Sequence, residues 1–336
     1  MSELRQNPAT KEWVIVATER AKRPDDFAKK TVEPVKKPAY DPKCPFCPGN
    51  ESLCTKEVFA YRENGTAPNT PGWTLKVVPN KFAALYPGEL VRGGNFFKTM
   101  SGIGVHEVVV ETPEHHLTMG TMSVEQIEKV ISAYSERYHA ISEDKRMDLI
   151  TIFRNNGKSA GTSLEHPHSQ IIGSPIVPVH IRYKIQEAVR YFDDTGRCVY
   201  CDALKEELAI KDKIVLETNE FVALEPFASK SPFETWILPK KHESSFKNIN
   251  TAEKRDLAKV LREVLGKLYV GLNDPSYNMM IHSAPRQEDP ADYYHWHIQI
   301  VPRITTPAGF ELGSGIYINV VRPEDAAKFL REMRSS

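Results

Sequence analysis

The sequence predicts an α+β protein formed by tandem duplication of one unit, an antiparallel sheet with packed helices. Three observations support this fold class. A series of motifs in the first half recurs in the same order in the second, short segments carry the apolar pattern of strands, and each half has one long segment of helical period. We therefore expect an N-terminal catalytic domain over residues 1–178, a linker over 179–197 and a C-terminal domain over 198–336.

The repeat consists of four features. A C-x-x-C pair comes first in each half, and the pattern N-x-F-x-A-L follows, as "NKFAAL" and "NEFVAL". Next comes a glutamate that precedes a histidine by eight residues, in "EVVVETPEH" and "ETWILPKKH". The last is H-x-H-x-Q, which reads "HPHSQ" at 166–170 and "HWHIQ" at 295–299. Chance does not account for four features in one order, so the halves are diverged copies.

The individual elements follow from the spacing of apolar residues. Strands are expected over 73–79, 106–112, 148–155, 233–239, 277–283 and 295–302. Helices are expected over 123–142, where Ser123 and Gln126 form the pattern of a capping box, and over 251–273, where Thr251 is the expected N-cap. The Pro- and Lys-rich residues 24–43 lack periodicity and are expected to form an extended surface arm.

Composition narrows the class of function. The 336 residues include 44 basic and 44 acidic side chains, so no global field attracts nucleic acid or a membrane surface. The N-terminal segment lacks the apolar run of a signal peptide, and no apolar stretch is long enough to span a bilayer. We expect a soluble cytoplasmic protein without a nucleic-acid partner.

Four of the five cysteines form the two C-x-x-C pairs, a spacing that indicates metal or redox chemistry in a chain without a secretion signal. The repeat selects two histidines in each half to complete the sets. Two thiolates and two imidazoles suit tetrahedral Zn²⁺ with no open position. We therefore expect two structural zinc ions, the first held by Cys44, Cys47, His115 and His166 and the second by Cys198, Cys201, His242 and His295.

The first H-x-H-x-Q motif carries the candidate chemistry. On a strand, His166, His168 and Gln170 would share one face, and a zinc ion at the first histidine leaves His168 as a free imidazole. Such an imidazole can act as a nucleophile or general base. The preceding Gly- and Ser-rich "RNNGKSAGTSLEHPH" lets backbone N–H groups approach anionic oxygens closely. Gln170 can bind a phosphate oxygen but cannot deliver a proton, which favours a covalent intermediate over rapid hydrolysis.

The combination of "HPHSQ" after "FRNNGKSAGTS", with "CPFC" upstream and "ERAKRP" near the start, closely resembles the galactose-1-phosphate uridylyltransferase family of the histidine-triad superfamily. The resemblance extends from "NPATKEWVIV" to "GIYINVVRPED". It implies two histidine-triad-like domains, which agrees with the tandem repeat. It also implies a homodimer that acts on a nucleotide-sugar and a sugar 1-phosphate.

By this resemblance His168 attacks the α-phosphorus of the nucleotide-sugar, a sugar 1-phosphate leaves, and a second phosphate collects the nucleotidyl group in a ping-pong cycle. Gln170 would bind the nucleotidyl phosphate. Further residues match family positions near the phosphates, ribose and base: Arg20, Arg23, Asn80, Asn155, Gly161 and Ser163.

The sequence also departs from the best-known members, which carry a second metal site of one glutamate and three histidines. Here His282 and His297 match two of the histidines, and Gln299 stands at the third. The second Cys2His2 set instead resembles ADP-glucose phosphorylases, and Gly309 replaces a lysine that serves the acceptor sugar phosphate in uridylyltransferases. The expected reaction is UMP transfer between UDP-glucose and galactose 1-phosphate, with AMP transfer from ADP-glucose to phosphate as the alternative.

Two other classes of function remain open at this point: a histidine-triad hydrolase of nucleotides and a non-catalytic nucleotide-binding zinc protein. Gln170 opposes the first, and His168 in a phosphate-binding context opposes the second. The Gly- and Ser-rich loop is not repeated before "HWHIQ". We therefore expect His297 to be a structural or site-lining residue and only the first motif to be an active centre.

Overall fold

The computed structural model describes residues 2–17, 27, 37–63 and 65–335. Its central element is a sheet of ten strands in the order β10-β11-β12-β14-β13-β8-β9-β7-β4-β3, with every neighbouring pair antiparallel. These strands are β3 (Phe59–Arg62), β4 (Trp73–Pro79), β7 (Val105–Val110), β8 (Leu149–Asn156), β9 (His168–Ser174), β10 (Ile214–Glu217), β11 (Phe221–Leu224), β12 (Thr235–Pro239), β13 (Tyr277–His282) and β14 (His297–Pro302).

The strand order shows the duplication. From the middle outward, β8, β9, β7, β4 and β3 of the first half mirror β13, β14, β12, β11 and β10 of the second. The two halves meet where β8 pairs with β13, from Tyr277 opposite Asn156 to Ile281 opposite Ile152. The α+β tandem predicted from the sequence is confirmed, but the two expected sheets are one continuous sheet, since backbone pairing of β8 with β13 removes an exposed edge from each half.

The six strands expected from the sequence all form: β4 has the expected ends, and no end of the other five is shifted by more than two residues. The largest consequence is in the H-x-H-x-Q motifs, because β9 begins at His168 and β14 begins at His297. The first histidine of each motif, His166 and His295, therefore precedes its strand instead of lying on it. In the first half Pro167 separates the two histidines and has no N–H to give to a strand ladder.

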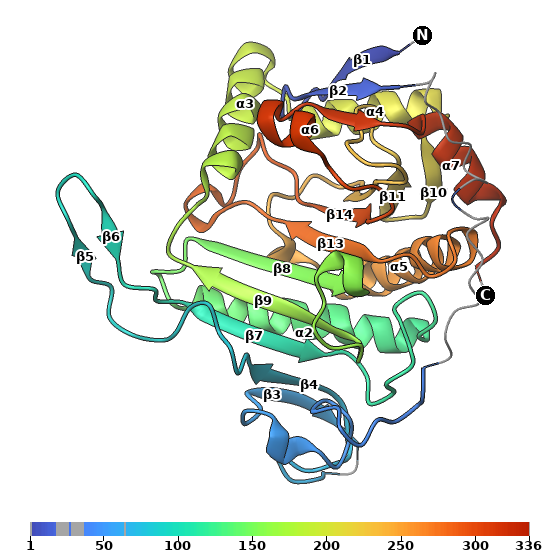
Figure 1. Cartoon of the computed structure of the whole chain (residues 1–336). Helices are drawn as coiled ribbons and strands as arrows, with labels where there is room; N and C mark the ends of the chain where they lie inside the picture. The colour runs from blue at the N-terminus through green and yellow to red at the C-terminus, as the bar shows by residue number, and fades with distance from the viewer. Residues whose placement is uncertain (1, 18–26, 28–36, 64, 336) are drawn as a thin grey trace.

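Two long helices cover one face of the sheet, α2 (Val124–Ser142) and α5 (Thr251–Gly271) (Figure 1). Apolar residues of both helices and of strands from both halves form one core cluster between them. Ser123 caps α2 by accepting a hydrogen bond from the Gln126 N–H, but the Gln126 side chain bonds to the carbonyls of Thr74 and Glu111, so the reciprocal half of the expected capping box does not form.

The start of α5 differs from the prediction. Asn250, not Thr251, is the N-cap: its side chain accepts from the Glu253 N–H at 3.0 Å, and the Glu253 carboxylate accepts from the Asn250 N–H at 2.9 Å. Asparagine and threonine are both good N-cap residues, and the reciprocal bond with Glu253 at the third helical position selects Asn250.

The remaining elements surround this sheet. The segment expected to be a linker forms α3 (Val179–Thr195), which leads to α4 (Val199–Ile210). A small sheet joins the chain ends, since β2 (Trp13–Val16) pairs with both β1 (Glu3–Gln6) and β15 (Tyr317–Asn319). The hairpin of β5 (Arg92–Gly93) and β6 (Thr99–Met100) extends away from the body (Figure 1), and α6 (Gly309–Ser314) and α7 (Pro323–Glu332) flank β15.

Most of the predicted surface arm, residues 24–26 and 28–36, lies outside the described residues, and 37–43 have no helix or strand. Among the described helices, none is both long and apolar enough to cross a lipid bilayer.

The capping geometry of α5 gives a first prediction. Asn250→Ala should lower the free energy of unfolding by about 1 kcal/mol, because it leaves the Glu253 N–H without its acceptor. Thr251→Ala, one residue away and inside the helix, should change it by much less. Urea unfolding monitored by circular dichroism compares the two variants, and a larger loss for Thr251→Ala would contradict the assigned cap.

Candidate active site

The candidate site lies on the sheet face opposite α2, near the beginning of β9. Strand alternation places His168 and Gln170 on this face, and the register of β7 with β9 puts Val110 opposite His168 and Val108 opposite Gln170. Ser169, between them, points to the other face, where its hydroxyl accepts from the Tyr134 hydroxyl of α2 at 2.7 Å. The helix layer thus supports β9 from behind and leaves the motif side chains on the open face.

The first Cys/His set comes together as predicted. The ligand atoms of Cys44, Cys47, His115 and His166 all lie within 4.8 Å of one another, and all four residues are buried. Cys47 Sγ is 3.4 Å from His115 Nδ1 and 3.6 Å from His166 Nδ1. The other nitrogen of His166, Nε2, donates to the Thr112 carbonyl at 2.7 Å, the outer hydrogen bond that orients metal-binding histidines. Burial lowers the pKa of His166 to about 3, so the ring is neutral as a ligand must be.

The second set repeats this arrangement. Cys198, Cys201 and His242 form a group that could hold a metal ion, and Cys201 Sγ lies 3.2 Å from His242 Nδ1 and 3.3 Å from His295 Nδ1. The rings of His242 and His295 are 5.3 Å apart at 79°, against 5.2 Å and 79° for His115 and His166. His295 Nε2 donates to the Pro239 carbonyl at 2.9 Å, and Pro239 occupies the place of Thr112 in the repeat. Both sets have the soft donors of a structural zinc site; all four ligand atoms are mutually close in the first, whereas in the second His295 approaches Cys201 but is not within 4.8 Å of every other ligand atom.

His168 has one nitrogen fixed and one available. Its Nδ1 donates to the His166 carbonyl at 2.8 Å, so the neutral ring carries its lone pair on Nε2, for which no partner is present among the described residues. Burial lowers the pKa of His168, which keeps the ring unprotonated at neutral pH. Phe46, from the "CPFC" turn, packs 5.4 Å from the His168 ring. The residue is therefore a rigidly oriented neutral imidazole.

A cavity of about 280 Å³ opens beside His168. Residues 154–158 and 162–168, with Lys37, line it. Gly157 adopts φ +80°, and a Cβ there would lie 2.3 Å from the Ser276 hydroxyl oxygen, so this turn requires glycine. Gly161 is also left-handed at φ +86°, and both it and Ser163 are exposed on the loop. Three cationic residues line the cavity, Lys37, Arg154 and Lys158, against one acidic residue, Glu165, so the lining suits an anionic ligand.

Asn155 and Asn80 approach the motif from the two sides. Asn155 lies on β8, and its Oδ1 accepts from Asn278 Nδ2 of β13 at 2.8 Å. The same Asn278 group donates to the Ala160 carbonyl in the loop at 2.9 Å. Asn80 follows β4, and its Nδ2 donates to Gln170 Oε1 at 3.3 Å. The second half therefore positions part of the first half's loop.

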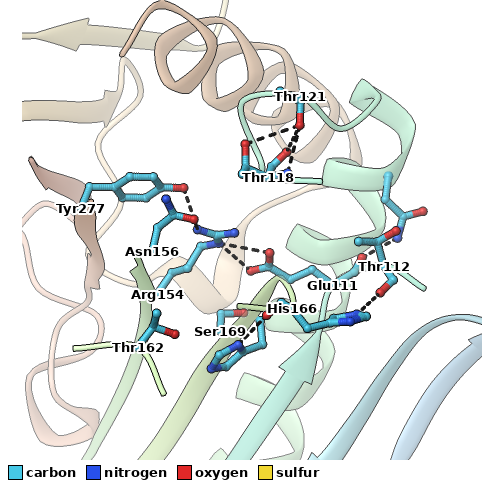
Figure 2. Close-up of polar contacts among 12 residues, drawn as sticks. Glu111, Thr112, Thr118, Thr121, Arg154, Asn156, Thr162, His166, Ser169 and Tyr277 are labelled. Atoms are coloured by element: carbon cyan, nitrogen blue, oxygen red, sulfur yellow. Dashed lines mark hydrogen bonds and ion pairs between the residues drawn. The ribbon is translucent and has the colours of Figure 1, made fainter. Parts of the chain in front are cut away.

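Behind the site lies a buried ion pair of the first half, and Tyr277 of the second half hydrogen-bonds to its arginine (Figure 2). Arg154 Nε lies 3.1 Å from both carboxylate oxygens of Glu111, and Arg154 Nη1 donates to Asn156 Oδ1 and to the Tyr277 hydroxyl, each at 2.8 Å. Burial alone would lower the pKa of Arg154, but Glu111 raises it above its ordinary value. The Glu111 N–H donates to the Pro167 carbonyl at 3.1 Å, so this pair holds the peptide between the two histidines of the motif.

The second H-x-H-x-Q motif has a different environment. His297 Nδ1 donates to the His295 carbonyl at 3.1 Å, as in the first copy, but the ring is only 1% exposed. It stacks on Trp236 at 4.6 Å and on His282 at 4.8 Å. Gln299 accepts from His282 Nε2 at 2.9 Å and donates to Glu234 at 2.7 Å. The arrangement supports the prediction that His297 does not act as a second nucleophile.

Comparison with known proteins agrees with this geometry. Residues 1–178 match the family model of the galactose-1-phosphate uridyl transferase N-terminal domain, and residues 184–334 match that of its C-terminal domain. The chain belongs to the galactose-1-phosphate uridylyltransferase family. It is an enzyme of the nucleotidyltransferase class, as the sequence predicted.

Two branches of the uridylyltransferase family are represented among the relatives. The chain is 38% identical to the ADP-glucose phosphorylase of Arabidopsis thaliana, over 98% of this chain and 93% of that protein. It is 35% identical to the galactose-1-phosphate uridylyltransferase of Thermotoga maritima, over 99% and 98%. The crystal structure of the Arabidopsis ADP-glucose phosphorylase with bound ADP-glucose superposes with a TM-score of 0.83 at 34% identity, and covers all of both chains. A uridylyltransferase structure gives a TM-score of 0.75 at 28% identity, over 98% and 97%.

Within this family site, sequence reasoning missed two side chains and two others are not described. His106 donates to Gln170, and Asn278 binds the loop, yet neither was assigned a role. Strand alternation could have revealed His106, since it lies two residues from Val108 on the face that carries Gln170. Asn278 was not accessible from the sequence because its role depends on the pairing of β8 with β13. Arg20 and Arg23, expected at the nucleotide site, lie outside the described residues.

Proposed function

We propose that this enzyme transfers a nucleotidyl group from a nucleotide-sugar to a phosphate-bearing acceptor through a covalent intermediate on His168. The observation that carries the proposal is the hydrogen bond from His168 Nδ1 to the His166 carbonyl. It directs the lone pair to Nε2 in a residue that lines the cationic cavity. The same bond stabilises the positive charge that develops on the ring when Nε2 forms a bond.

In the first half-reaction, His168 Nε2 bonds to the α-phosphorus while the bond from that phosphorus to the sugar phosphate oxygen breaks. The sugar 1-phosphate leaves with that electron pair. In the second, an oxygen of the acceptor phosphate attacks the same phosphorus and His168 Nε2 is released. Gln170 would donate its amide to a non-bridging oxygen. Asn155 and Ser163 line the cavity that would hold the remaining phosphate and ribose, and Gly161 lies on the loop beside it. Gln170 supplies no proton for a water attack, which favours transfer over hydrolysis.

The donor nucleotide distinguishes the two branches of the family. UMP transfer from UDP-glucose to galactose 1-phosphate is the reaction expected from the sequence. AMP transfer from ADP-glucose to phosphate is favoured by two observations, the bound ADP-glucose in the Arabidopsis neighbour and the second Cys2His2 set. Turnover of each donor with each acceptor separates the branches. We also propose that the enzyme is a homodimer and that it is located in the cytoplasm.

Both Cys/His sets are proposed to hold Zn²⁺. Cys44, Cys47, His115 and His166 would hold the first ion, which would tie the cysteine segment to the start of β9; Cys198, Cys201, His242 and His295 would hold the second. With two thiolates and two imidazoles each, the sites have no open position, so the ions would contribute to folding and not to the reaction.

The covalent step is tested by isolating the adduct. Wild-type protein incubated with radiolabelled ADP-glucose or UDP-glucose should form an acid-labile, base-stable nucleotidyl adduct, because the phosphorus–nitrogen bond of phosphohistidine has that stability. His168→Asn, which lacks the Nε2 nucleophile, should form none, while His139→Asn, exposed on α2, should react as wild type does. Equal labelling of the His168 variant, or no labelling of wild type by either donor, would contradict the mechanism.

The zinc proposal is tested by comparing two cysteines of the same segment. Cys44→Ser should remove close to one zinc ion per chain and lower the melting temperature, since one thiolate of the set is lost. Cys54→Ser is the matched control, because Cys54 Sγ donates to the Pro45 carbonyl outside the set. Plasma mass spectrometry gives the metal content, and an unchanged content in Cys44→Ser would refute the first site.

A further inference from the structure

His106 is the side chain nearest to Gln170 that neither the sequence nor the proposed mechanism has used. It lies on β7, on the same face as Gln170, and its Nε2 is 2.7 Å from Gln170 Oε1. Its Nδ1 lies 3.0 Å from the backbone N of Ala84. The ring therefore bridges the segment that follows β4 and the glutamine of the H-x-H-x-Q motif.

The backbone decides which way this bridge points. The Ala84 N–H can only donate, so His106 Nδ1 must be the acceptor and the neutral ring must carry its proton on Nε2. That proton is then donated to Gln170 Oε1. The opposite tautomer would set two N–H groups against each other at Ala84. The tautomer of His106 thus follows from a main-chain N–H, which can only donate.

A second backbone amide fixes Asn80 in the same way. The Phe82 N–H donates to Asn80 Oδ1 at 2.9 Å, which leaves Nδ2 as the group directed at the motif. Asn80 Nδ2 is 3.0 Å from His106 Nε2 and 3.3 Å from Gln170 Oε1. Because His106 Nε2 bears a proton, the oxygen of Gln170 is the acceptor for both groups. Two donors therefore hold Oε1, and the Gln170 amide nitrogen is turned to the opposite side.

The duplicate motif provides the contrast. Glu234 stands in the second half where His106 stands in the first, since each lies two residues before the residue paired with the motif glutamine, Trp236 for Gln299 and Val108 for Gln170. There Gln299 Oε1 accepts from His282, and its amide nitrogen donates to Glu234 at 2.7 Å, so the N–H groups are already engaged. In the first half the Gln170 amide nitrogen meets no acceptor within the described part of the chain. The copy with His106 is the one whose glutamine keeps a free donor on the face of His168.

We infer that His106 is a positioning residue: it holds Gln170 so that the amide N–H groups face the phosphate oxygens of the group being transferred to His168. This rests on the proposed function. A glutamine free to rotate would also present its oxygen to the anion, and the repulsion in that orientation would raise the barrier to transfer. His106 removes that orientation without touching the phosphate.

The two nitrogens of His106 can be separated by substitution. His106→Gln places an amide nitrogen near the position of Nε2 and keeps the donor to Gln170. His106→Asn places an oxygen near the position of Nδ1, keeps the acceptor for Ala84 and loses the donor. The single-turnover rate of adduct formation should fall roughly tenfold to a hundredfold in His106→Asn, as for loss of one oriented donor, and much less in His106→Gln. His139→Asn should match wild type.

A double-mutant cycle with Gln170→Ala distinguishes positioning from a structural effect. If His106 acts through Gln170, His106→Asn should slow the Gln170→Ala enzyme no further. An equal slowing in both backgrounds would overturn the inference, as would His106→Asn at the wild-type rate. Melting temperature and zinc content should be unchanged in His106→Asn, which excludes loss of folding as the cause.

An activity-independent measurement keeps this test separate from that of the covalent mechanism. Long-range ¹⁵N–¹H correlation spectra should show His106 as the neutral tautomer with its proton on Nε2. A proton on Nδ1 would refute the inference even in an enzyme that forms the adduct. If wild type forms no adduct, the proposed function fails, and the spectrum still decides whether His106 orients Gln170.

Discussion

The pairing of β8 with β13 is the interaction on which the rest of the molecule depends. It converts two half-sheets into one, and so gives α2 and α5 a common face to cover. It also places Tyr277 and Asn278 of the second half beside Arg154 and Asn155 of the first. Without this junction the guanidinium would lose one of its three buried partners, and the loop over the cavity would lose the amide that holds Ala160. The C-terminal half thus contributes residues to the site, although His297 of its own H-x-H-x-Q motif is buried.

Much of the fold was predictable because motifs that are weak evidence alone occur twice in the same order. One C-x-x-C pair or one pair of distant histidines says little, but the same order of features twice identified both Cys/His sets, and the structure brings them together. The strands and both long helices followed from periodicity. The pairing between the halves could not be predicted from the sequence. The strands β8 and β13 are far apart along the chain, and neither has a pattern that identifies the other as its partner. The hydrogen bond from Arg154 to the Tyr277 hydroxyl was hidden for the same reason.

The local errors have small physical causes. Asn250 and Thr251 are adjacent residues that both favour N-caps, and the choice depended on a reciprocal bond with Glu253 that spacing alone does not reveal. His166 was placed on a strand that begins only at His168, because the pattern could not show how Pro167 and the Thr112 carbonyl divert the chain. His106 was left without a role because the sequence repeat sets Phe233 against it, whereas the strand register sets Glu234 there. Departures from a repeat, as well as agreements, carried information about the site.

The N–H groups of Phe82 and Ala84 have a consequence for how this site can change. They set the orientation of Asn80 and His106, and through them that of Gln170, yet every residue except proline provides the same N–H. The orientation of Gln170 therefore depends on the path of the main chain at residues 82 and 84 and not on the side chains at these two positions. The Phe82 side chain is 83% exposed. Substitution of this side chain would therefore leave the orientation of Asn80 unchanged, as long as the N–H at this position is kept.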